Sequence, residues 1–287
     1  MKQMKYGFSF RGSKSKIAED IIKILPSAEN FYDLFAGGGA ITHCALLSGK
    51  WKNVYANDIQ GTMKLFLDAV NGKYRNEKRW ISREQFNAEK DKDQYIRWIW
   101  SFGNNGKSYL YGEKNEKIKK EAHEFLFANG YDYTSEKRIE LTKLFRKKIK
   151  KEGIFKLEYL ERLQHLGQLE RLQHLEKINQ SLLQRLKISD KDYKDIEIKP
   201  NSVVYCDIPY SMKKVKTKED YYGIKFDIKD FYKWAKKIKH PVYFSDCFCD
   251  DDYFIPVWEK ESICLMNNKY SGNGKKKIIE KLYWNKI

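Results

Sequence analysis

The stretch Phe31–Ala40, FYDLFAGGGA, decides the fold class of this chain. Its apolar first half is typical of a short buried strand, and the three consecutive glycines predict a tight turn. A helix is expected from Ala40 to Leu47, because the following Ser48-Gly49 is a typical signal for the end of a helix. Glycines let the backbone come close to a ligand, and a helix N-terminus presents unpaired N–H groups. The stretch therefore predicts a strand–turn–helix unit that can bind a small molecule.

A second strand is predicted at Asn53–Asp58, and it ends in a carboxylate. Asp58 lies 19 residues after Gly39 (58 − 39), close to the spacing at which an acidic residue binds ribose hydroxyls. The turn reads Gly-Gly-Gly and not G-x-G-x-x-G, which disfavours a dinucleotide. A ligand with one nucleoside and no pyrophosphate fits better, and S-adenosylmethionine is the obvious candidate. The alternative is a tight turn whose glycines serve packing alone.

The stretch Val203–Tyr210, VVYCDIPY, predicts a further strand that delivers polar groups to an edge of the sheet. In an open α/β sheet, ligands bind beyond the carboxyl ends of the strands. Asp207 can accept a hydrogen bond from an amino group, and Tyr210 offers a ring on which a flat base can stack. This combination suits a base that carries an amine, although an ordinary strand-to-turn junction can contain the same residues.

Three short blocks of the chain resemble the DNA adenine methyltransferases of the Dam type, which methylate the exocyclic amine of adenine. They follow that family's order: Phe10–Lys14 (FRGSK), Asp33–Gly39 (DLFAGGG) and Asp207–Tyr210 (DIPY). Two weaker matches are Ile188–Tyr193, which looks like the family's element before the catalytic strand, and Phe102–Gly106 with Tyr109–Gly112, which looks like its DNA-facing region. The resemblance covers most of the chain, and its specificity lies in the three short blocks.

The resemblance implies a reaction in which the target adenine is flipped out of the duplex. Asp207 and the carbonyl of Ile208 would accept hydrogen bonds from its amine, and Tyr210 would stack on the base. Ile208 stands where the family has the first of two prolines, which keeps the carbonyl but loses some rigidity of the turn. Asp58 would hold the ribose of the cofactor, and Asp192 with Tyr193 would border its adenine.

The resemblance also implies a full set of site residues. Those implied as catalytic are Asp207, Ile208, Pro209 and Tyr210; those implied as cofactor-binding are Phe10, Gly12, Lys14, Asp33, Phe35, Ala36, Gly37, Gly38, Gly39, Asp58, Asp192 and Tyr193. The residues that we expect to bind DNA are Asn104, Asn105, Lys107 and Tyr109, which lie in or next to the basic and aromatic part of the insertion. The alternative for Asn104 and Asn105 is that they simply form a turn.

The predicted fold is α/β: a Rossmann-like methyltransferase sheet with helices on both faces, interrupted by a mainly helical insertion. We expect a catalytic, S-adenosylmethionine-binding domain at 1–75 and 182–287, and an inserted target-recognition domain at 76–181. Elsewhere apolar spacing predicts helices over Ser13–Leu25 and Ile228–Ile238, and strands over Val242–Phe244 and Ile278–Trp284.

A leucine-repeat segment at 157–178 lies within the insertion, where LERLQHLGQ at 160–168 is followed by LERLQHL at 169–175. Leucines at every third position drift around a helix of 3.6 residues per turn. Either a helix is buried on more than one side, or the repeats form a short solenoid-like coil. His165 and His174 occupy one repeated position, which argues against a metal-binding role for them.

The charge of the chain favours a nucleic acid as partner. Lysine and arginine number 56 against 39 aspartates and glutamates, a net charge of +17 with a sequence pI near 9.4. Phosphate contacts supply most non-specific affinity for nucleic acid, so double-stranded DNA is the expected partner. A lysine-rich surface can also reflect genome composition. The block Lys107–Lys151 is dense in basic and aromatic residues, and we expect DNA recognition there.

The five cysteines and five histidines show no metal-binding spacing, so we expect reduced thiols and no metal. No N-terminal signal peptide is apparent, and no apolar stretch approaches the ~20 residues that span a bilayer. We therefore expect a cytoplasmic protein of a bacterial cell or a virus-infected bacterial host, without a membrane partner. We also expect it to be a monomer or weak dimer. A restriction–modification system, a virus or a stand-alone modification role all remain open.

Two other functions remain open on the sequence. A methyltransferase acting on a protein glutamine amide could use a similar acidic-x-Pro-Tyr motif, although its motifs are expected to lie closer together. A DNA-binding relative without catalysis is suggested by Ile208 alone. The resemblance to the family makes GATC the first recognition sequence to test.

Overall fold

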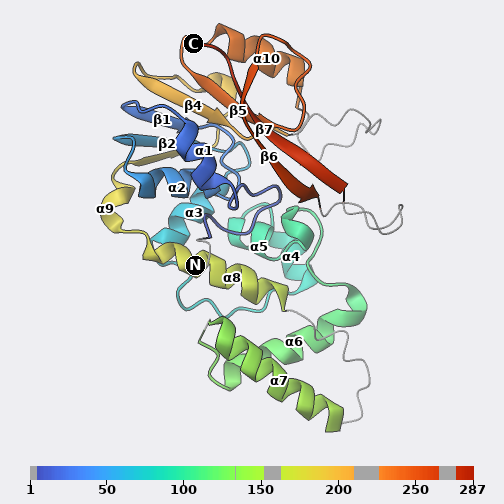
Figure 1. The fold of residues 1–287 in the computed structure, drawn as a ribbon. Coiled ribbons are helices and arrows are strands. Elements are labelled where there is room, and N and C mark those ends of the chain that lie inside the picture. Colours follow the sequence, from blue (N-terminus) through green and yellow to red (C-terminus); the bar gives the residue numbers. More distant parts are fainter. Residues whose placement is uncertain (1–4, 133, 152–162, 210–225, 265–275) are drawn as a thin grey trace.

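The computed structural model describes residues 5–132, 134–151, 163–209, 226–264 and 276–287. Seven strands form one sheet in the order β3-β2-β1-β4-β5-β7-β6 (Figure 1). They are β1 (Asn30–Asp33), β2 (Asn53–Asn57), β3 (Leu186–Ser189), β4 (Ser202–Cys206), β5 (Val242–Asp246), β6 (Ile255–Cys264) and β7 (Lys276–Trp284). The first five strands in the sheet order run parallel, whereas β7 is antiparallel to both of its neighbours.

The order of the strands reverses between β1 and β4. From β1 the chain continues to β2 and β3 on one side, and β4 and β5 then extend the sheet on the other side. Such a reversal is where α/β sheets form a ligand crevice. In the register, Asp33 stands opposite Tyr205, and the N–H of Leu34 donates to the carbonyl of Tyr205 at 3.0 Å. The segments that follow β1 and β4 therefore leave the sheet side by side at one edge.

Helices cover both faces of this sheet. On one face α1 (Ala18–Ile24) and α2 (Ala40–Ser48) pack on a buried cluster that contains Val203. On the other face α10 (Ile228–Lys237) packs on a cluster that contains Val204. Neighbouring residues of one strand belong to different clusters because successive side chains point to opposite faces. The predicted α/β fold with helices on both faces is confirmed.

The predicted insertion contributes to two hydrophobic clusters. One joins α3 (Thr62–Val70) to α4 (Arg83–Glu89), α5 (Gln94–Ile99) and the second half of α8 (Gln164–His174). The other joins α6 (Glu113–Ala128), α7 (Ser135–Lys151) and the start of α8. In Figure 1 the α6–α7 pair lies at the end of the molecule away from the sheet. The first cluster is thus continuous with the predicted catalytic part, and the second is local to the insertion.

Residues 164–174 of the leucine-repeat segment form α8, and a 3-10 turn follows at Leu175–Lys177. Leu166 packs in the cluster of α6 and α7, whereas Leu169 and Leu172 pack in the cluster of α3 and α5. The helix is therefore buried on more than one side, which is one of the two arrangements left open by the sequence. Residues 160–162, at the start of the first copy of the repeat, lie outside the described residues.

The N-terminal helix is shorter than predicted, because α1 begins at Ala18 and not at Ser13. The residues before it have other partners: Ser15 Oγ accepts a hydrogen bond from the N–H of Tyr6, and Lys14 turns inward. The predicted later elements agree closely with α10, β5 and β7. Remaining short elements are the 3-10 turns η1 (Phe102–Asn104) and η4 (Tyr193–Asp195) and helix α9 (Gln180–Leu183). None of the described helices is long and apolar enough to cross a membrane.

Candidate functional site

The N-terminal block and the corner after β4 meet at the crevice edge of the sheet. Lys14 Nζ lies 2.5 Å from Asp207 Oδ1, and the two side chains are 5% and 21% exposed. Lys14 Nζ also donates to the carbonyl of Gly12 at 3.3 Å. Burial by itself lowers the pKa of Lys14, but neighbouring carboxylates outweigh it, so the pKa is raised and Lys14 stays charged. Two of the predicted site residues thus form a buried ion pair.

The glycine turn packs directly against the N-terminal block. The N–H of Phe8 donates to the carbonyl of Gly38 at 2.9 Å. A Cβ on Gly37 would lie 2.9 Å from the ring of Phe10, and a Cβ on Gly39 would lie 2.7 Å from the ring of Phe66. Packing alone thus accounts for glycine at these positions, as the alternative interpretation of the sequence allows. Support for a ligand comes from other atoms around the turn.

Asp33 supplies such an atom. Its Oδ2 accepts hydrogen bonds from the N–H of Thr42 at 3.1 Å and from Thr42 Oγ1 at 2.7 Å. Its Oδ1 is buried and has no hydrogen-bond partner among the described residues. Burial raises the pKa of this carboxyl to about 7, against the lowering effect of Thr42. Because an unpaired buried acceptor is costly, this oxygen suits a ligand that brings a cationic or N–H donor.

Asp58 stands beside the same turn, at the end of β2. Its Oδ2 accepts from the N–H of Gly37 at 2.8 Å, and its Oδ1 accepts from the N–H of Gln60 at 3.0 Å. Burial raises the pKa of the carboxyl, whereas these backbone hydrogen bonds lower it. Each carboxylate oxygen has a second lone pair, so the side chain can still accept from ribose hydroxyls.

Aromatic rings form a wall next to this carboxylate region. The ring of Phe35 lies 5.2 Å from that of Tyr193 and 5.7 Å from that of Phe226. Asp192 caps the η4 turn by accepting from the N–H of Lys194 at 2.9 Å. Ala36 is buried, and its N–H donates to the carbonyl of Asn57. The wall offers an apolar surface for a flat ring.

The corner after Asp207 is partly described. Ile208 is buried in the same apolar cluster as Leu34 and Phe231, which explains why an aliphatic residue is accommodated there. Packing holds the turn where the family uses a proline. Pro209 is half-buried. Tyr210, which the sequence assigns to base stacking, lies outside the described residues.

The predicted DNA-facing loop is held by hydrogen bonds within the protein. Asn104 Nδ2 donates to the carbonyl of Trp98 at 2.8 Å and to Gln168 Oε1 at 2.9 Å. Asn105 Oδ1 accepts from the N–H groups of Lys107 and Ser108 at 2.8 and 3.0 Å. Both asparagines therefore shape the loop, as the turn interpretation of such residues allows.

The exposed groups of this loop differ from the expected ones. Tyr109 is only 7% exposed, and its hydroxyl donates to the carbonyl of Ile81 at 2.7 Å. Lys107 is exposed, and so is Phe102, at 61%. Phe102 belongs to the predicted loop but is not among the residues that the sequence predicts to bind DNA. The loop contacts Trp98, whose ring lies 5.2 Å from Phe10 beside the glycine turn.

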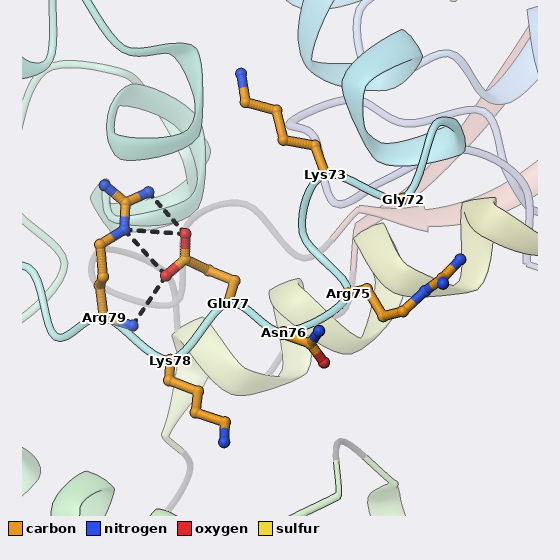
Figure 2. A pocket seen from close by; sticks show the side chains of 7 residues that line it. All are labelled: Gly72, Lys73, Arg75, Asn76, Glu77, Lys78 and Arg79. Atoms are coloured by element: carbon orange, nitrogen blue, oxygen red, sulfur yellow. Dashed lines mark hydrogen bonds and ion pairs between the residues drawn. The ribbon is translucent and has the colours of Figure 1, made fainter.

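A separate surface hollow of about 630 Å³ lies in the connection between α3 and α4 (Figure 2). Its lining residues are Gly72, Lys73, Arg75, Asn76, Glu77, Lys78 and Arg79. Glu77 is bound by Arg79, with the guanidinium Nη2 2.7 Å from Oε2. None of these residues belongs to the predicted site, and the mainly basic lining suits an anion better than an apolar ligand.

The described residues contain no group of three or more histidine, cysteine, aspartate or glutamate side chains that could hold a metal ion. Cys44, Cys206, Cys247 and Cys249 are free thiols. The fifth cysteine, Cys264, is described only as part of β6.

The comparison with protein families agrees with this site. The family described as D12 class N6 adenine-specific DNA methyltransferase matches residues 10–247, which span the N-terminal block, the glycine turn and the corner at Asp207. A search of curated proteins found no match.

Proposed function

The chain belongs to the D12 class N6 adenine-specific DNA methyltransferases, and on this premise we propose that its β1–β4 crevice methylates a flipped adenine, with S-adenosylmethionine as donor. DNA adenine methylation is the activity of the family. The observation that carries the finer proposal is the shared edge of two neighbouring parallel strands, where the glycine turn follows β1 and Asp207 follows β4.

The residues around the glycine turn fit the proposed cofactor. Asp33 Oδ1 offers an unpaired buried acceptor to the ammonium group, and Asp58 offers carboxylate oxygens to the ribose. Phe35 and Tyr193 offer a ring surface to the adenine of the cofactor. S-adenosylmethionine supplies a methyl group on a sulfonium, which is the electrophile of the reaction. Phe10, Gly12, Ala36 and Asp192 complete the set that we propose for this part of the site.

Asp207 and Ile208 have a different task, which is to orient the target amine. The Asp207 carboxylate and the Ile208 carbonyl accept its hydrogens, so that the nitrogen lone pair points away from them. Pro209 limits the freedom of the turn, and Tyr210 stacks on the base. Good alignment of reacting groups lowers a barrier by up to ~7–11 kcal/mol, so no covalent enzyme intermediate is needed.

DNA contacts are proposed for the loop and for the basic surfaces of the insertion. The exposed ring of Phe102 can stack on or wedge between bases, and Lys107 can contact a phosphate. The basic hollow between α3 and α4 is a second candidate for phosphate contacts. We assign target recognition to residues 76–181, with GATC as the first sequence to test.

The deciding experiment compares Asp207→Ala with Asp20→Ala in methyl transfer from labelled S-adenosylmethionine to unmodified DNA. Asp207→Ala should abolish transfer while cofactor binding stays close to that of the unchanged protein, because Asp207 contacts the amine and not the cofactor. Asp20 is the control: it forms an exposed ion pair with Lys260 at 2.7 Å, so its removal should leave transfer intact.

Undiminished transfer by Asp207→Ala contradicts the assigned role. If the unchanged chain binds DNA but fails to bind S-adenosylmethionine, it is a catalytically inactive relative. Mapping of the modified adenines then identifies the recognition sequence.

A further inference from the structure

Lys14 has a second carboxylate partner that the proposed function does not use. Its Nζ lies 3.4 Å from Glu280 Oε1, in addition to the 2.5 Å contact with Asp207. Glu280 comes from β7, and its side chain is 11% exposed. One buried ammonium is therefore shared between the carboxylate proposed to bind the target amine and a carboxylate with no assigned task.

The short contact with Lys14 creates a conflict for catalysis. A charge-assisted hydrogen bond occupies one oxygen of Asp207 and reduces its strength as an acceptor for a neutral amine. Expelling Lys14 into solvent is no solution, because Asp207 would then face the carboxylates of Glu280 and Asp246 in a buried place without a compensating cation. Lys14 needs another partner within reach, and Glu280 is that partner.

We propose that Glu280 is a positioning residue, which takes over the ammonium of Lys14 when the target amine reaches Asp207. The inference rests on the proposed function, in which Asp207 accepts a hydrogen from that amine. Lys14 Nζ moves from Asp207 towards Glu280, where 3.4 Å leaves room for a shorter contact. The same ammonium and the same two carboxylates are present before and after, so no proton moves and no bond breaks.

A double-mutant cycle tests this exchange, with Glu280→Gln, Lys14→Met and both changes together. The readouts are the single-turnover rate of methyl transfer to unmodified DNA and the affinity for S-adenosylmethionine. Glu280→Gln should slow transfer about tenfold or more with cofactor affinity nearly unchanged, because Asp207 is then the stronger of the two partners for the ammonium of Lys14, being the one that still carries a charge. In the Lys14→Met background, the same change should cause no further slowing or should speed transfer, since it removes a carboxylate that faces Asp207.

Glu280→Asp is the conservative control. It keeps the charge but shortens the side chain, so transfer should be faster than in Glu280→Gln. In the Lys14→Met background, the variants with glutamate and with aspartate at position 280 should transfer the methyl group at the same rate. This variant also serves as the test if Glu280→Gln fails to fold.

Three results overturn the inference: an unchanged rate in Glu280→Gln, rate losses that multiply in the double variant, or a Glu280→Asp rate no better than that of Glu280→Gln. Each is distinguishable from failure of the proposed function. If Asp207→Ala loses transfer but the cycle shows independent effects, only the exchange is wrong. If Asp207→Ala keeps transfer, the proposed role of Asp207 itself fails.

Discussion

The charge state of Asp207 is set by its burial and by its immediate neighbours. The pKa of its carboxyl is raised to about 6, because burial and the carboxylates of Glu280 and Asp246 raise it by more than Lys14 lowers it. The group therefore titrates within the range in which an enzyme can be assayed. Its ionised form is the better hydrogen-bond acceptor for an amine, so its titration should be visible in the rate.

We expect the rate constant kcat/KM for DNA, measured at DNA concentrations well below saturation, to be level above the pKa of Asp207 in the free protein and to fall on the acid side with a midpoint near pH 6. The sign follows from protonation, because a neutral carboxyl accepts from the target amine more weakly. In Glu280→Gln the midpoint should move to lower pH, since Glu280 raises the pKa of Asp207. A rate profile that stays flat between about pH 5 and about pH 8 contradicts this role.

The glycines of the turn differ in what surrounds them, which allows a matched comparison. Gly39 and Gly49 both have a left-handed backbone, with φ of 71° and 67°. A Cβ on Gly39 meets the ring of Phe66, whereas one on Gly49 meets nothing within 4 Å. Gly49→Ala should therefore cost about 1 kcal/mol of unfolding free energy, and Gly39→Ala about 2–4 kcal/mol. Equal losses in urea denaturation would show that the contact with Phe66 is easily relieved.

At the scale of elements, α6 and α8 are joined by a buried hydrogen-bond chain. His123 Nδ1 lies 2.9 Å from His165 Nε2, His165 Nδ1 lies 2.6 Å from the hydroxyl of Tyr111, and His123 Nε2 lies 2.9 Å from the carbonyl of Lys78. These contacts are satisfied when Tyr111 donates to His165, His165 to His123, and His123 to Lys78. Both imidazoles are then neutral, in agreement with the lowered pKa that burial causes at each.

This hydrogen-bond chain predicts a loss of stability in acid. The unfolded histidines, with a pKa near 6.5, take up protons before the folded ones do, so stability is complete above about pH 6.5 and falls below it. The slope per histidine is at most about 1.4 kcal/mol per pH unit. His165→Gln should reduce this slope. His174→Gln, at the more exposed copy of the same repeat position, should change it less.

Denaturant unfolding at several pH values between about 5 and about 7 measures these slopes. A slope in His165→Gln equal to that of the unchanged protein would mean that the hydrogen-bond chain does not control acid stability.

For the whole molecule, the excess of 56 basic over 39 acidic residues should appear as a salt-dependent affinity for DNA. The exposed lysines of α7 are candidates for phosphate contacts, whereas Lys52 and Lys199 precede β2 and β4 and so lie at the opposite edge of the sheet from the crevice.

The double change Lys143→Gln and Lys147→Gln should reduce the slope of log affinity against log salt by about 0.9 for each phosphate that is no longer neutralised. The same slope in the control pair, Lys52→Gln with Lys199→Gln, should stay close to that of the unchanged protein. Fluorescence anisotropy of a labelled duplex over a salt series measures both. Equal reductions in the two pairs would point to net charge and not to a binding surface on α7.

The sequence by itself determined the local parts of this protein: the strand–turn–helix at Phe31–Ala40, the strand that ends at Asp207, the family resemblance and the excess of positive charge. These depend on apolar periodicity, glycine content and motif order, which are properties of short stretches. Only the tertiary structure decided which partner each polar group has. It paired Lys14 with Asp207 and Glu280 and joined His123 to His165. It also gave Asn104 and Tyr109 hydrogen-bond partners within the protein. Such contacts join residues far apart in the chain, so no local pattern contains them.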